Sequence, residues 1–102
     1  MDRKKLDRLW LDLGAARNSP QKAGDLQDLA RRAGRRERTG GKHSSMWVTD
    51  HFPHRAFPIP THGNKDVSIG VRNVVLNALE ADAAAWEDVL ERNEQIENGN
   101  GA

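Results

Sequence analysis

The sequence predicts a small α+β domain, in which helices pack on one face of a three-stranded antiparallel sheet. Two patterns carry this prediction. Apolar residues recur at helical spacing before residue 34 and after residue 66, whereas residues 35–60 alternate in character and are interrupted by glycine and proline. Helices grouped around a run of strands are typical of an α+β architecture. At 102 residues the chain has room for one hydrophobic core.

Two short helices are predicted in the first third of the chain. The first presents one apolar stripe formed by Leu6, Leu9, Trp10 and Leu13. Gly14 and the Asn18-Ser19-Pro20 link bring it to an end. The second has a similar stripe formed by Leu26, Leu29, Ala30 and Ala33. Gly34 is a natural stop for it, because glycine takes the left-handed conformation at little cost.

Three strands follow. Residues 35–39 and 43–49 are predicted to pair across a Gly40-Gly41 turn, and residues 55–60 form a third strand. Pro58 and Pro60 require this third strand to be short or to lie at an edge, because proline cannot donate a ladder hydrogen bond. Alternation in the second strand places His43, Ser45 and Trp47 on one face and Ser44, Met46 and Val48 on the other. The pattern leaves open which face meets the helices.

The C-terminal third is predicted to be helical and then disordered. A helix begins at Asp66 or Ser68, with apolar positions Val71, Val74, Val75, Ala78 and Leu79. The spacing continues through Ala83, Trp86 and Leu90, either in the same helix or in a separate one. We therefore divide the chain into an N-terminal helix and link (1–20), a core domain (21–80), an acidic helical extension (81–97) and a disordered tail (98–102).

Composition excludes several classes of protein. The chain has no cysteine, which rules out disulfides, thiolate chemistry and zinc ribbons. It has no apolar run near the roughly 18 residues that span a bilayer, so no membrane association is expected. Its first five residues lead into no signal-peptide core, so we expect a cytoplasmic protein. His51 and His54 lie close together in a proline-containing loop without Cys or Glu at ligand spacing, so neither a metal nor another cofactor is predicted.

Charge is segregated along the chain. Residues 1–79 hold 15 of the 16 basic and 8 of the 15 acidic side chains, a net +7, and residues 80–102 carry −6. The densest basic cluster is Arg31, Arg32, Arg35, Arg36, Arg38 and Lys42. Such a cluster either attracts a polyanion such as RNA or is an ordinary solvated surface. The acidic helix could fold back over this cluster, dock a partner through Trp86 and Leu90, or only solubilise the chain.

Three features of residues 25–79 occur in a set order. They are the Gly41-Lys42-His43 turn, Trp47, and the motif Ile59-Pro60-Thr61-His62-Gly63-Asn64-Lys65-Asp66, followed by a helix with Gly70 and Arg72 near its start. With these features, residues 25–79 resemble the HicA-type toxins of toxin–antitoxin pairs. The resemblance implies a double-stranded-RNA-binding-domain-like α-β-β-β-α fold and ribosome-independent mRNA cleavage. It also implies a HicB-like antitoxin as partner. Lys42 stands where the family usually has serine, and the acidic helix lies beyond the family's core.

The predicted site is centred on His43. Cleaving RNA through its own 2′-hydroxyl needs a general base, a general acid and positive charge on the phosphate, and histidine titrates near neutral pH. Lys42, His62 and Lys65 are candidates to complete the site, since the start of one antiparallel strand lies beside the end of the next. His62 could instead cap its turn. The predicted RNA contacts are Arg31, Arg32, Arg35, Arg36, Arg38 and Trp47, although Trp47 either stacks on a base or belongs to the core.

Two other functions are compatible with the sequence. The scaffold could bind nucleic acid without cleaving it, consistent with lysine at position 42. Residues 1–33 could instead form a DNA-binding helix pair, but neither helix has the basic composition of a recognition helix. The oligomeric state stays open, a homo-oligomer included.

Overall fold

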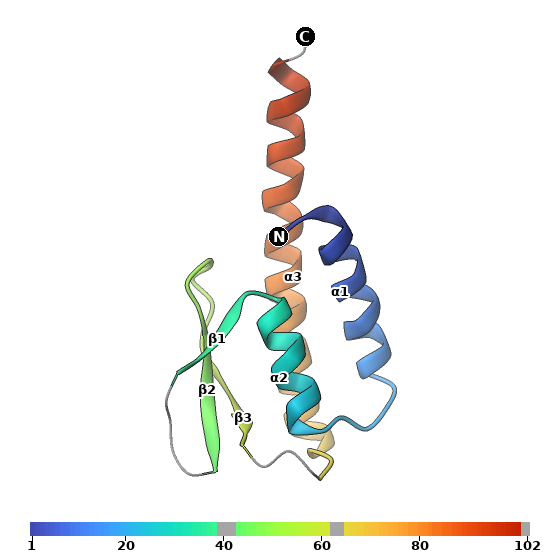
Figure 1. Ribbon diagram of the computed structural model, residues 1–102, viewed down its shortest axis with the longest axis vertical. Helices are drawn as coiled ribbons and strands as arrows, with labels where there is room; N and C mark the ends of the chain where they lie inside the picture. The colour runs from blue at the N-terminus through green and yellow to red at the C-terminus, as the bar shows by residue number, and fades with distance from the viewer. Residues whose placement is uncertain (39–42, 62–64, 101–102) are drawn as a thin grey trace.

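The computed structural model describes residues 1–38, 43–61 and 65–100 and confirms the predicted α+β class. The elements follow one another as α1 (Arg3–Ala16), α2 (Ala23–Arg32), β1 (Arg35–Arg38), β2 (Ser44–Thr49), β3 (Phe57–Pro60) and α3 (Ile69–Asn100). Their order therefore contains the predicted succession of a helix, three strands and a helix, preceded by one further helix. Figure 1 shows the three helices on one side of the sheet.

Polar side chains start the first two helices, and apolar ones hold them in place. Asp2 caps α1 by accepting a hydrogen bond from the Lys5 N–H at 2.8 Å, and the Asp25 carboxylate accepts one from the Lys22 N–H at 3.1 Å. The predicted leucine stripes of both helices are buried. After α2 the chain reverses through Gly34, whose φ of +94° favours glycine.

The sheet has the order β1-β2-β3, and both pairings are antiparallel. In the register, Trp47 lies opposite Glu37 on one side and Phe57 on the other, while Ser45 lies opposite Ile59. Ser45, Trp47, Phe57 and Ile59 are buried, so this is the face that meets the helices. β3 is an edge strand, as its two prolines predict.

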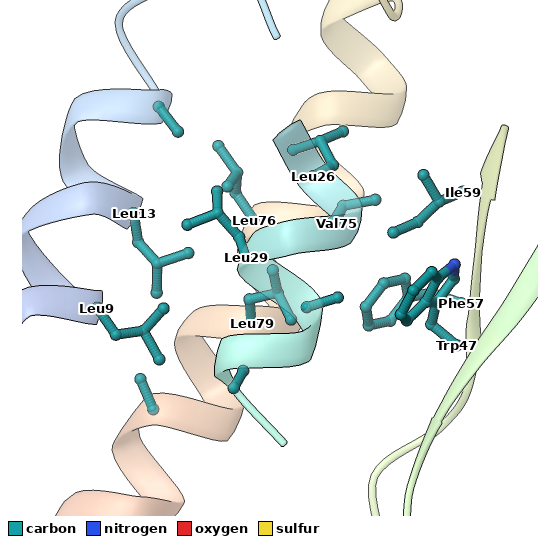
Figure 2. Close-up of a cluster of buried hydrophobic side chains, with 14 of the residues drawn as sticks. Leu9, Leu13, Leu26, Leu29, Trp47, Phe57, Ile59, Val75, Leu76 and Leu79 are labelled. Carbon is teal, nitrogen blue, oxygen red and sulfur yellow. The ribbon is translucent and has the colours of Figure 1, made fainter. Parts of the chain in front are cut away.

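The core lies between the three helices and the inner face of the sheet (Figure 2). α1 contributes Leu9 and Leu13, α2 contributes Leu26 and Leu29, and the sheet contributes its buried rings and Ile59. The central element is α3, which buries Val75, Leu76, Leu79 and Ala83 against the others.

α3 is one continuous helix that includes the predicted acidic extension and residues 98–100, where disorder was predicted. Its C-terminal part projects beyond the rest of the molecule (Figure 1). The whole molecule, this helix included, measures 54 × 28 × 17 Å. Among the described side chains, no acidic residue of α3 forms an ion pair with Arg31, Arg32, Arg36 or Arg38. Glu87 and Glu94 pair with Arg3, and Glu80 pairs with Arg17 at 3.0 Å, so these three carboxylates join α3 to α1. None of the described helices combines the length and the apolarity that crossing a bilayer requires.

Candidate functional site

His43 lies exposed immediately before β2, at one end of the sheet. Its backbone carbonyl accepts a hydrogen bond from the Thr61 N–H at 3.0 Å, and the next residue, Ser44, is paired with Pro60. The end of β3 therefore lies beside the start of β2, as the antiparallel arrangement predicted. His62 follows Thr61 directly in the chain, but both His62 and Lys42 lie outside the described residues.

Lys65 is exposed at the same end of the molecule as His43. The next residue, Asp66, forms a backbone bridge with Lys22, and the Val67 N–H donates to the Gln21 carbonyl at 2.8 Å. These contacts tie the segment before α3 to the start of α2. β3 is tied to the same helix, because the Gln27 side-chain amide donates to the Pro60 carbonyl at 3.1 Å. The fold thus brings the segments that carry His43 and Lys65 to the same end of the molecule.

The structure divides the predicted basic cluster among three places. Arg31 and Arg32 belong to the last turn of α2, while Arg36 and Arg38 lie on the sheet face that the helices leave open. Arg36 is exposed but paired with Asp50 at 2.7 Å. The Arg36 guanidinium holds the pKa of the Asp50 carboxyl below its ordinary value, chiefly through this hydrogen bond. A phosphate would therefore have to compete with Asp50 for Arg36. Arg38 is exposed and makes no ion pair with a described residue.

Arg35 departs from the expectation of a surface RNA contact, because its side chain lies in the core. It is only 1% exposed and forms two hydrogen bonds with the fully buried Asp82, at 2.7 and 3.0 Å. It also donates to the backbone carbonyls of Trp47 and Arg55 and stacks 4.6 Å from the Phe57 ring centroid. These contacts occupy four of its five N–H donors, so Arg35 has a structural role and cannot reach a phosphate.

Trp47 is likewise a core residue, which decides between the two alternatives left by its pattern. It is fully buried, and its ring is covered by the Arg31 guanidinium at 5.0 Å from the ring centroid. Its indole N–H has no hydrogen-bond partner among the described residues. A base cannot stack on a ring that is closed off in this way.

The structure contains one polar cluster that the sequence patterns did not predict, formed by Arg35, His54 and Asp82. The His54 Nδ1 lies 2.7 Å from Asp82 Oδ1, so Asp82 contacts both His54 and Arg35. His54 is part of the loop after β2, and Asp82 is on α3, 28 residues later. No local spacing could indicate such a pair. The described residues contain no group of three or more side chains suited to hold a metal ion.

Comparison with protein-family models, with curated proteins and with solved structures found no match to this chain. The function is therefore inferred from the residues of the site and from the motifs of the sequence.

Proposed function

We propose that this protein is an endoribonuclease that cleaves mRNA in the cytoplasm with His43 as a catalytic residue. One observation carries the proposal: an exposed histidine stands at the start of β2, and its backbone is hydrogen-bonded to Thr61, the residue before His62. The motif Ile59 to Asp66 therefore passes beside His43 in space, although Thr61 comes 18 positions after His43 in the chain.

The chemistry requires no cofactor. A base takes the proton from the RNA 2′-hydroxyl, which attacks the adjacent phosphorus, and an acid protonates the departing 5′-oxygen. An exposed imidazole can act in either step near neutral pH. The second role belongs to Lys42, which precedes His43 in the chain, to His62, which follows Thr61, or to the exposed Lys65. A lysine there would stabilise charge on the phosphate.

The open face of the sheet suits an RNA strand approaching this site. Arg38 is one of the outward-facing residues of β1, and Arg36 comes two residues before it on the same face of the strand. The resemblance to HicA-type toxins leads us to expect a HicB-like antitoxin that covers His43. The helix-bearing face, by contrast, is closed by the core and offers no path for RNA past Trp47.

The test compares the wild type with His43→Ala in cells and in vitro. Induced wild type should arrest growth and degrade mRNA, and the purified variant should cleave RNA at least about 100-fold more slowly, the usual contribution of a general acid or base. Arg92→Ala, on the exposed part of α3, is the matched surface control and should keep full activity.

Circular dichroism and thermal melting must show that both variants fold. If wild type and His43→Ala are equally harmless, or cleave RNA at equal rates, the proposal is wrong. Harmless, folded proteins that still bind RNA would identify a non-catalytic RNA-binding module.

A further inference from the structure

A cavity of about 820 Å³ opens where the start of α1, the end of α2 and the middle of α3 meet. The charged and aromatic residues that matter for its chemistry are Lys4, Lys5, Arg8, Arg31, Arg32 and Trp86. Gly34 lies just before β1 and His51 just after β2, at the same end of the β1–β2 pair, and both residues also line the cavity.

This basic cavity lies far from His43. Gly34 precedes β1, and His51 follows Thr49, the residue paired with Arg35, so the cavity is at the Thr49 end of β2. His43 is at the Ser44 end, and a strand of six residues separates the two ends by roughly 20 Å. The cavity is therefore not part of the proposed cleavage site.

The charge of the cavity indicates an anionic ligand. Five of its described lining residues are lysine or arginine and one, Asp2, is acidic, with its carboxylate accepting a hydrogen bond from the Lys5 N–H. Asp12 pairs with Arg32 at 2.8 Å and with Arg8 at 3.3 Å, and Asp28 pairs with Arg31 at 3.1 Å. Lys4 and Lys5 are exposed and make no ion pair with a described residue. Two ammonium groups on successive residues, neither of them paired with a described carboxylate, are suited to bind phosphate.

The aromatic wall indicates that the anion carries a base. The half-buried Trp86 is held in one orientation, because its indole N–H donates to the Ala33 carbonyl at 2.8 Å. The His51 ring packs beside it with centroids 4.8 Å apart. Gly34 permits this arrangement, since a Cβ at that position would lie 3.1 Å from the His51 ring. A fixed indole next to cations is a combination that binds nucleotides of single strands.

We infer that this cavity is a second nucleotide site, in which a single-stranded RNA places one base against Trp86 and neighbouring phosphates against Lys4 and Lys5. The inference rests on the proposed function in taking RNA as the ligand, but it does not require cleavage at His43. An acidic peptide would satisfy the lysines and leave the aromatic wall without a matching group, so a nucleotide fits the cavity better.

The first experiment follows the indole N–H signal of Trp86 in two-dimensional NMR, assigned with the Trp86→Phe variant. Uridine 5′-monophosphate, ribose 5-phosphate and a glutamate-rich peptide are titrated separately into the full chain. The nucleotide should shift the Trp86 signal and bind at least about fivefold more tightly than ribose 5-phosphate, because a stacked base adds that much. Ribose 5-phosphate or the peptide binding as tightly as the nucleotide would overturn the inference.

The second experiment uses an uncleavable 2′-O-methyl oligonucleotide and two charge-matched double variants. Lys4→Gln/Lys5→Gln should weaken binding and make the slope of log K against log salt shallower by about 1.4, the value for two lost single-strand phosphate contacts. Lys22→Gln/Arg92→Gln removes the same charge from positions elsewhere on the molecule and should leave the slope unchanged. Equal effects of the two pairs would contradict a site at the cavity.

His43→Ala separates this inference from the proposed function. The variant should bind uridine 5′-monophosphate as the wild type does and yet fail to cleave RNA. If it binds the nucleotide and still cleaves, the proposed function fails and the second nucleotide site stands. If it loses cleavage while the nucleotide leaves the Trp86 signal of both proteins unmoved, the second site fails and the proposed function stands.

Discussion

At the scale of single residues, the buried pair of Arg35 and Asp82 has the largest structural consequence. Two parallel hydrogen bonds join the guanidinium to the carboxylate, and His54 and two backbone carbonyls complete the polar cluster. Burying charges is unfavourable unless each is compensated in this way. The pair therefore connects β1 to α3, and each partner depends on the other.

We predict that Asp82→Asn destabilises the protein by roughly 3–5 kcal/mol, because it leaves the Arg35 charge buried and uncompensated. Urea unfolding measures the loss. Asp50→Asn is the matched control, since it breaks the exposed pair with Arg36, and it should leave the unfolding midpoint nearly unchanged.

Should Asp82→Asn fail to fold, the double variant Arg35→Met/Asp82→Leu keeps the prediction testable. It removes both charges and should fold with nearly wild-type stability. Equal midpoints for Asp82→Asn and Asp50→Asn would show that the buried pair is not a structural requirement.

At the scale of elements, the junction of α2 and β1 depends on Gly34. Its positive φ turns the chain from the helix into the sheet, and the Gly34 N–H donates to the Arg31 carbonyl at 3.0 Å. His51 and Trp86 close over it, so the residue also needs to be small. The same glycine thus ends a helix and forms part of the cavity wall.

We predict that Gly34→Ala destabilises the protein by more than about 1 kcal/mol, because alanine is strained at this φ and its Cβ would crowd His51 and Trp86. Gly14→Ala is the control. Gly14 is inside α1, and a Cβ at that position would have nothing within 4 Å, so alanine there should stabilise by about 0.5–1 kcal/mol. Thermal unfolding of the two variants should shift in opposite directions, and shifts in the same direction would contradict this account of Gly34.

At the scale of the whole molecule, α3 is the element on which the others assemble. Its first half packs on α1, α2 and β3, and its acidic side chains pair with Arg3 of α1 and with Arg17, the residue after α1. Beyond Leu90 the described side chains are exposed. The helix therefore consists of a structural half and a projecting half.

We predict that truncation after Glu91 leaves the fold intact, whereas truncation after Ala81 abolishes it by removing Asp82, Ala83 and Trp86. Thermal melting followed by circular dichroism measures both. The shorter truncation should also leave RNA affinity unchanged, because Glu94, which it removes, pairs with Arg3 and not with Arg36 or Arg38. A rise in affinity would restore the idea that the acidic end shields the RNA-binding face.

The local elements could be predicted because each depends on neighbours in the chain. The leucines of α1 and α2 recur at helical spacing, Gly34 ends a helix, and the prolines of β3 require an edge strand. The position of His43 was also accessible, since antiparallel pairing places it beside the end of β3.

The tertiary structure decided which of the polar and aromatic residues are available for function. Arg35 and Arg36 are adjacent residues of the same type, yet one is buried against Asp82, 47 residues away, and the other is exposed. The cavity likewise joins Lys4 and Lys5 to Trp86 across the length of the chain. Sequence alone determined the helices, the strands and the end of the sheet at which His43 lies, because hydrophobic periodicity and turn chemistry are local. Burial and charge pairing were decided by the packing of α3, because they depend on contacts between residues distant in the chain.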